Sequence, residues 1–230
     1  MTEAKWHVSV EETPQGFALL RGDKPLLTPM GHPLAVPQAP LAAAIAEEWQ
    51  GQQQRIRKYE LPLTSLACVA IDLAGNKREA ATNDILPYAG TDLICYRAGD
   101  IPALRDRQSE VLDPLCAWAK ERFGVALTLT EGVMPVAQPL ENETGLKRVI
   151  DTYDMWTFAV LASCVKPLGS LILALALVER RVNAQDAFRL GHLEELYETE
   201  QWGADEEKDA KMRALENDLA AAERFLLLAA

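Results

Sequence analysis

The sequence lacks the short motifs that mark most nucleotide-binding and hydrolytic enzymes. It contains no G-x-G-x-x-G or G-x-x-x-x-G-K-[ST] loop, no H-E-x-x-H zinc motif and no G-x-S-x-G nucleophile turn. Bound phosphates need a glycine-rich turn that opens a helix, so ATP use is not expected. Histidine is scarce, since only His7, His32 and His192 occur, and we expect each to be exposed or internally bonded. We therefore predict no catalytic residues and a protein that is not an enzyme.

Cysteine is also sparse and carries no metal-binding pattern. Cys68, Cys95, Cys116 and Cys164 are scattered singly, without any C-x-x-C pair. This distribution predicts buried free thiols in a reducing compartment instead of disulfides or a thiolate metal site. The acidic residues between Asp205 and Asp209 lack the D-x-D-x-D-G spacing that surrounds calcium with oxygen atoms. We predict neither a metal ion nor a cofactor.

Positive charge is in short supply. The 230 residues include 23 Lys and Arg against 34 Asp and Glu, a formal net charge of −11. A surface of this sign repels nucleic acid and anionic membranes. The charge therefore favours a basic or polar protein partner and excludes nucleic acid.

No apolar run is long enough to cross a membrane. The longest, from Met155 to Val178, is interrupted at Lys166, Pro167 and Gly169. Each half is about half of the roughly 20 residues that a bilayer requires, so we predict two buried helices and no membrane insertion. The opening MTEAKWHVSVEE has neither a basic segment followed by an apolar run nor an Arg-rich transit pattern, which predicts a cytoplasmic location.

The periodicity of apolar residues changes along the chain. Up to about residue 40, alternating residues such as Trp6, Val8 and Val10 indicate short strands separated by turns. Helical spacing follows from Pro40, and the polar stretch QQQRIRKYE, residues 52–60, reads as a loop between two parts. We predict an α+β fold, with a small β-rich N-terminal domain at residues 1–60 and a larger, mainly helical domain at residues 61–230.

The predicted helical domain contains two short strands before its final helices. TDLICYRA and VALTLTEG have strand character and flank a long helix from about residue 101 to 123. After Gly145 the pattern is helical throughout, with helices around 146–150, from 184 to 201 and from 206 to 228.

The segment ETEQWGADEEKDAK, residues 198–211, concentrates acidic residues around one tryptophan. On a helix, Glu200 falls on the same stripe as Leu193 and Leu196, where a buried carboxylate needs a partner. The partner is either internal, such as an Arg or the Trp202 indole N–H, or a group on another protein. Alternatively, the helix frays at its end and Glu200 reaches solvent. Trp202, two residues later, either covers the helix junction or is exposed as an anchor for a partner. Tryptophan often contributes much of the binding energy at protein interfaces.

The residues after Trp202 have helix-boundary roles. Gly203 is a natural helix stop and Asp205 a natural N-cap. Glu206 and Glu207 fall in the next first turn, where the helix dipole favours negative charge. Capping alone would account for Asp205 and Glu206.

Several segments in order resemble the ATP12 family of F1-ATPase assembly chaperones. They are PLLTPMGHPLAVP, AIAEEWQGQ, LPLTSLACVAID, YAGTDLICYRA, DPLCAWAKERFG, LTEGVMPVAQP, GSLILALALVE and ETEQWGADEE, between about residues 16 and 228.

The resemblance implies an ATP-independent, non-catalytic chaperone in the bacterial cytoplasm. It would bind the free α subunit of F1-ATPase and shield its assembly surface until the β subunit replaces it. The resemblance also implies partner-binding roles for Glu200, Trp202, Asp205 and Glu206. Two alternatives remain open, namely a cofactor-free hydrolase and a small-ligand binding module, each using a cleft between the two domains.

Overall fold

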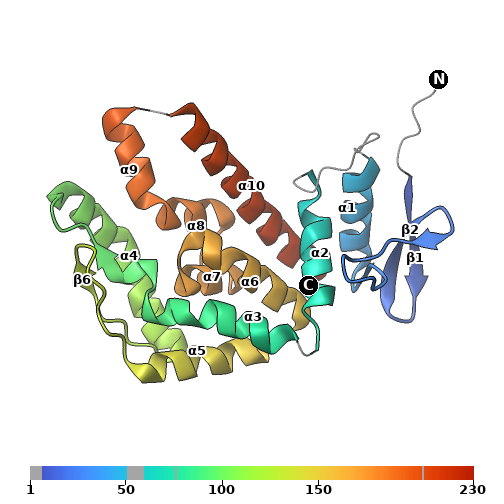
Figure 1. The fold of residues 1–230 in the computed structure, drawn as a ribbon, viewed down its shortest axis with the longest axis horizontal. Coiled ribbons are helices and arrows are strands. Elements are labelled where there is room, and N and C mark those ends of the chain that lie inside the picture. Colours follow the sequence, from blue (N-terminus) through green and yellow to red (C-terminus); the bar gives the residue numbers. More distant parts are fainter. Residues whose placement is uncertain (1–6, 51–59, 76, 204) are drawn as a thin grey trace. The chain divides into compact units, whose positions relative to one another are not determined.

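The computed structural model describes residues 7–50, 60–75, 77–203 and 205–230. A small group of strands begins the chain and helices dominate the rest (Figure 1). The predicted α+β fold class is therefore confirmed. The predicted loop at residues 52–60 lies outside the described residues, except for Glu60.

The N-terminal strands form an antiparallel sheet with the second strand at its centre. Thr13 pairs with Gly16 at a tight hairpin. Gly16 has φ +118°, and a Cβ there would lie 2.4 Å from the Val36 carbonyl oxygen, so only glycine fits. The strands are β1 (Val8–Thr13), β2 (Gly16–Arg21), β3 (Lys24–Pro25) and β4 (Ala35–Val36).

Two helices, α1 (Ala39–Gln50) and α2 (Pro62–Asp72), follow the sheet. The Glu48 carboxylate at the end of α1 accepts hydrogen bonds from the backbone N–H groups of Leu63 (2.7 Å) and Thr64 (2.9 Å). These are free donors in the first turn of α2, whose first residue is a proline. Burial raises the pKa of Glu48, and the carboxylate joins the two helices.

The remaining elements are mainly helical. They are α3 (Lys77–Ile85), the 3-10 helices η2 (Leu86–Gly90) and η3 (Leu93–Cys95), β5 (Tyr96–Arg97), α4 (Pro102–Phe123), β6 (Thr130–Glu131), α5 (Leu140–Thr152), α6 (Met155–Leu168), α7 (Leu171–Val178), α8 (Ala184–Gly191), α9 (Leu193–Trp202) and α10 (Glu206–Ala229).

The chain divides into two compact units. Unit 1 comprises residues 1–78, 154–160 and 221–230, and unit 2 comprises residues 79–153 and 161–220. Helices α6 and α10 each contribute residues to both units. The domain boundary predicted after residue 60 stays a prediction.

Helix α7 forms the centre of the unit 2 core. Every residue from Leu171 to Leu177 is buried. The predicted break before α7 is confirmed, since α6 ends at Leu168 and Gly169 follows with φ +62°. Among the described residues, no helix has the length and apolar character needed to span a bilayer.

The fully buried carboxylate of Asp92 fixes the N-terminus of α7. It accepts hydrogen bonds from the backbone N–H groups of Ile172 (3.0 Å) and Ile94 (3.2 Å). Ser170 completes the cap by accepting from the Leu173 N–H at 2.9 Å. Burial raises the pKa of Asp92 to about 6, although the hydrogen bonds favour its charged form.

Three predicted elements differ from the structure. The strand predicted in TDLICYRA is reduced to Tyr96–Arg97 in β5, because Leu93–Cys95 before it form the 3-10 helix η3. The helix predicted over 184–201 is divided into α8 and α9, because the backbone of His192 (φ −124°, ψ 29°) is not helical. The strand predicted in VALTLTEG is reduced to Thr130–Glu131 in β6, which pairs with β5 in parallel. Before β6, the Asn142 amide bonds both the N–H (3.2 Å) and the C=O (2.8 Å) of Ala126. A side chain thus satisfies backbone groups that a neighbouring strand would otherwise bond.

Candidate partner-binding surface

The end of α9 carries the predicted surface residues. Leu193 is buried at the start of this helix, and Trp202 is its last residue. Gly203 then adopts φ +91°, and its N–H bonds the Thr199 carbonyl at 3.0 Å. A residue with this φ is usually glycine, so the predicted helix stop at Gly203 is confirmed.

Asp205 caps the next helix as predicted. Its carboxylate accepts the Lys208 N–H at 2.8 Å, and α10 begins one residue later at Glu206. The Lys208 ammonium also pairs with Glu198 across the turn at 2.9 Å, and this hydrogen bond raises the pKa of Lys208. Side-chain bonds therefore connect the end of α9 to the start of α10.

Glu200 has an internal cation as its partner. The guanidinium of Arg107 on α4 donates from Nη1 to Oε2 at 2.7 Å and from Nη2 to Oε1 at 3.1 Å. These hydrogen bonds lower the pKa of Glu200. The carboxylate is not buried with the apolar stripe, because its side chain is 52% exposed. Glu200 therefore has an internal partner and also reaches solvent at the end of α9, so an outer face of the carboxylate stays free to meet another molecule.

Trp202 is exposed and does not cover the helix junction. It keeps 72% of its surface in solvent. Asp205 and Glu206 are exposed as well, on the other side of Gly203. The structure thus places an aromatic side chain beside acidic groups on one turn of unit 2, which is the composition of a surface that binds a cationic or apolar protein segment. We call Glu200, Trp202, Asp205 and Glu206 the acidic turn.

Sequence reasoning found these residues but not Arg107. The ion pair joins positions 93 residues apart in the sequence. Arg107 has no local pattern that singles it out from the other arginines of α4, so only the packing of α4 against α9 reveals the pair.

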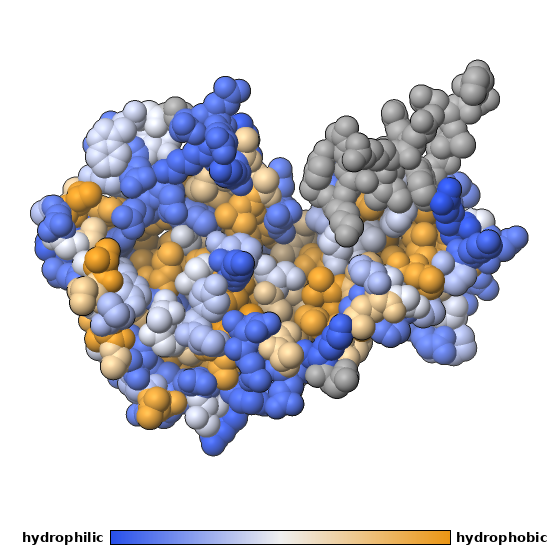
Figure 2. All heavy atoms as spheres, in the orientation of Figure 1, coloured by the Kyte–Doolittle hydropathy of each residue, from blue (hydrophilic) through white to orange (hydrophobic). Residues whose placement is uncertain are grey.

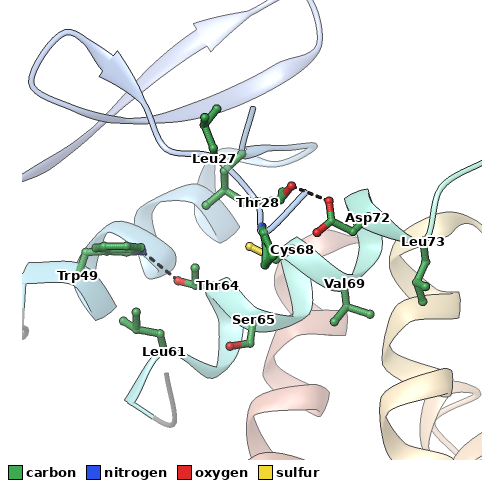
Figure 3. Close-up of a pocket in the computed structure, with 12 residues that line it drawn as sticks. Leu27, Thr28, Trp49, Leu61, Thr64, Ser65, Cys68, Val69, Asp72 and Leu73 are labelled. Carbon is green, nitrogen blue, oxygen red and sulfur yellow. Dashed lines mark hydrogen bonds between the residues drawn. The ribbon is translucent and has the colours of Figure 1, made fainter. Parts of the chain in front are cut away.

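A pocket of about 560 Å³ in unit 1 was not predicted. Its walls come from the segment after β3, the end of α1, and α2 (Figure 3). Most of the lining is apolar, and the principal apolar residues are Leu27, Leu34, Trp49, Leu61, Val69 and Leu73. The volume is in the range of small-molecule sites.

Most polar side chains that line this pocket are bonded within the protein. The Thr28 hydroxyl donates to Asp72 at 2.5 Å, and Trp49 Nε1 donates to the Thr64 hydroxyl at 3.1 Å (Figure 3). His32 Nδ1 lies 3.0 Å from the same Asp72 carboxylate. The pocket therefore offers apolar contact more than hydrogen bonds to an incoming group.

Three of the four cysteine thiols, those of Cys95, Cys116 and Cys164, are poor nucleophiles. Burial raises the pKa of Cys95 and of Cys164 to about 12, and it raises that of Cys116. A catalytic cysteine requires the opposite shift, because the thiolate is the reactive form. These three residues therefore give no support to the thiol version of the hydrolase alternative. Among the described residues, no group of three or more His, Cys, Asp or Glu could hold a metal ion.

Comparison with known proteins gives the class of the protein as a chaperone. The family model described as ATP12 chaperone protein matches residues 5–120, about half of the chain. The chain belongs to this family. The membership identifies an ATP12-type chaperone that acts in F1-ATPase assembly.

Three relatives show how far the similarity extends. Atp12 from Paracoccus denitrificans is 36% identical, with a TM-score of 0.88 over 97% of this chain and 96% of that chain. An aspartate-to-lysine mutant of P. denitrificans Atp12p is 35% identical, with a TM-score of 0.89 over 99% of this chain and 98% of that chain. The mitochondrial protein atp12 of Schizosaccharomyces pombe is 26% identical over 212 residues, covering 86% of this chain and 73% of that protein.

Proposed function

We propose that this protein binds the free α subunit of F1-ATPase in the bacterial cytoplasm and shields its assembly surface until the β subunit takes that place. Its action needs neither ATP nor catalysis. The observation that carries the proposal is the likeness to Atp12 of P. denitrificans, which extends over nearly the whole chain at 36% identity. The finer identification of the α subunit as the client comes from the sequence resemblance to the ATP12 family.

The acidic turn is the proposed contact with the client. Trp202 is exposed where the chain reverses between α9 and α10, and both flanking helices are fixed by side-chain bonds. Side chains that are already held by such bonds lose little conformational entropy on binding. Glu200 pairs with Arg107, but both side chains remain about half exposed. The carboxylate can therefore also interact with a cation on another protein.

The direct test is complex formation. The purified protein is mixed with free F1 α subunit and run on a sizing column, with bovine serum albumin in place of the α subunit as the control. We expect co-elution only with the α subunit. Separate elution of two correctly folded proteins contradicts the proposal.

A charge swap tests the role of Glu200 in that complex. Glu200→Lys places a lysine against Arg107 and is expected to abolish the complex, whereas the unfolding temperature changes little because the pair is exposed. The double variant Glu200→Lys with Arg107→Glu restores an internal ion pair of reversed sign. If Glu200 faces the client, the double variant stays inactive. Recovery of binding would instead assign Glu200 to positioning α9.

A further inference from the structure

Unit 2 exposes an apolar loop outside the acidic turn. Val133 is 92% exposed, Met134 73% and Leu140 84%. Figure 2 shows hydrophobic side chains at the surface around β6 and the start of α5. Single exposed apolar residues are ordinary, but a group of large ones within eight positions marks an interaction site or an aggregation hazard. We call residues 129–140 the apolar loop.

Side-chain amides hold the base of the apolar loop. The Gln138 side chain accepts the Thr128 N–H at 2.9 Å and donates to the Thr128 carbonyl at 2.8 Å. Asn142 bonds Ala126 in the same two-way manner. The Gly132 N–H adds a bond to the Arg97 carbonyl at 2.8 Å. The loop is therefore anchored on α5 and on β5, and it presents Val133 and Met134 in a preset position.

A further exposed apolar residue, Ile101, lies on a chain segment that contacts the apolar loop. Ile101 is 36% exposed and directly precedes α4. Its neighbour Gly99 approaches Gly132 closely, since a Cβ on Gly99 would lie 3.4 Å from the Gly132 nitrogen. The segment that leads to Ile101 and the segment that leads to Val133 therefore lie against each other at these two glycines.

The charged side chains of the two segments that form this patch are all acidic, and the partly exposed Arg105 one turn after Ile101 pairs with Asp106. Asp100, Glu131, Glu141 and Glu143 are exposed, and residues 99–101 and 129–143 contain no Lys or Arg. The first lysine that follows on α5, Lys147, pairs with Asp151 at 2.8 Å. Apolar side chains within an acidic rim match a partner segment that carries apolar residues flanked by basic ones.

The apolar loop is connected to the acidic turn through α4. Ile101 lies at the start of this helix, and Arg107 binds Glu200 six residues later. Six residues of helix span about 9 Å, so one partner can contact both places. Both surfaces carry exposed apolar groups among carboxylates, and both belong to unit 2.

We propose that the apolar loop, with Ile101, is a second docking site for the client protein and that it binds an apolar segment flanked by Lys or Arg. The site rests on the proposed function, because the client is the same protein that the acidic turn binds. The apolar loop supplies buried area and the acidic rim speeds association.

The test uses the full chain and the variant Val133→Ser with Met134→Ser. Both side chains are exposed, so the unfolding temperature is expected to stay unchanged. We expect the affinity for the F1 α subunit to fall at least about tenfold, because truncated anchors often cost this much. Leu227→Ser is the matched control, since Leu227 is 57% exposed but belongs to unit 1, and it should bind as the unaltered protein does.

The outcomes separate this site from the proposed function. If the unaltered protein binds the α subunit and the double variant binds equally well, the apolar loop is not a docking site. If the unaltered protein does not bind at all, both proposals fail. Sedimentation equilibrium of the protein alone gives the remaining outcome. A dimer that the double variant abolishes would show that a second copy of this chain covers the loop, and would overturn the assignment to the client.

Discussion

Two carboxylates of unit 2 sit at helix boundaries in opposite surroundings. Asp92 is fully buried and its partners are backbone N–H groups at the start of α7. Glu200 lies near the end of α9, half exposed, and its partner is the charged side chain of Arg107 on α4. Burial raises the pKa of Asp92, whereas the hydrogen bonds from Arg107 lower that of Glu200.

The difference separates residues that hold the fold from residues that are available to a partner. The buried carboxylate of Asp92 stabilises α7 because no water can replace it as an acceptor. Water can replace Arg107 as a partner of Glu200, so this ion pair contributes little to stability and can be exchanged for a cation on another protein. Of these two carboxylates, only the exposed Glu200 is accessible to another protein.

Removal of the Asp92 carboxylate should have the largest effect on stability. In Asp92→Ala, two buried backbone donors lose their acceptor, which we expect to lower the free energy of unfolding by about 3 kcal/mol. Urea unfolding at pH 7.5 measures this. Glu200→Ala is the exposed counterpart and should unfold at nearly the wild-type urea concentration. Equal losses in the two variants would remove the distinction between the sites.

The raised pKa of Asp92 should also make the stability of the protein depend on pH, with a smaller effect than loss of the carboxylate. The folded pKa is about 6, above the ordinary value of 3.8, so the folded state binds more protons between these values. The free energy of unfolding must then fall as pH rises from about 4 to 6, by at most about 1.4 kcal/mol per pH unit for one group. Asp92→Asn cannot titrate, and subtracting its profile from the wild-type profile isolates this fall. A constant difference across pH 4–7 contradicts the raised pKa.

Trp202 should show the smallest effect on stability and a clear effect on binding. Because it is 72% exposed, Trp202→Ala should change the free energy of unfolding by less than about 0.5 kcal/mol. Its affinity for the F1 α subunit should fall about tenfold or more. Trp156→Ala is the comparison, since the Trp156 ring packs at 6.2 Å from that of Phe225 and its loss should lower stability. A marked loss of stability in Trp202→Ala would place Trp202 with the fold-holding residues.

Much of the fold could be predicted from local signals. Helix α4 and the break at Gly169 follow from apolar spacing and from residues with strong backbone preferences. The division between α8 and α9 was missed although Gly191, a residue that weakens helices, ends α8 directly before His192. The strand predicted before β6 failed because the amide of Asn142, far along the chain, takes the place of a neighbouring strand.

The candidate site was only partly predictable for the same reason. Helix-boundary chemistry at Gly203 and Asp205 is local, and the structure confirms it. Whether Glu200 is buried depends on where α9 leaves the packed part of unit 2, and its partner comes from α4. Exposure of Val133 and Met134 is likewise a tertiary property, because the sequence alone gives no reason for apolar residues to remain in water.

The composition of unit 1 has a consequence for biosynthesis. This unit combines residues 1–78 with residues 154–160 and 221–230, and within it the Arg78 guanidinium lies 4.1 Å from the Phe158 ring centroid. The ring of Trp156 likewise packs near Phe225, which is fully buried. A growing chain folds from its N-terminus. The strands of residues 8–36 must therefore wait for residues 221–230 to be translated before their unit is complete.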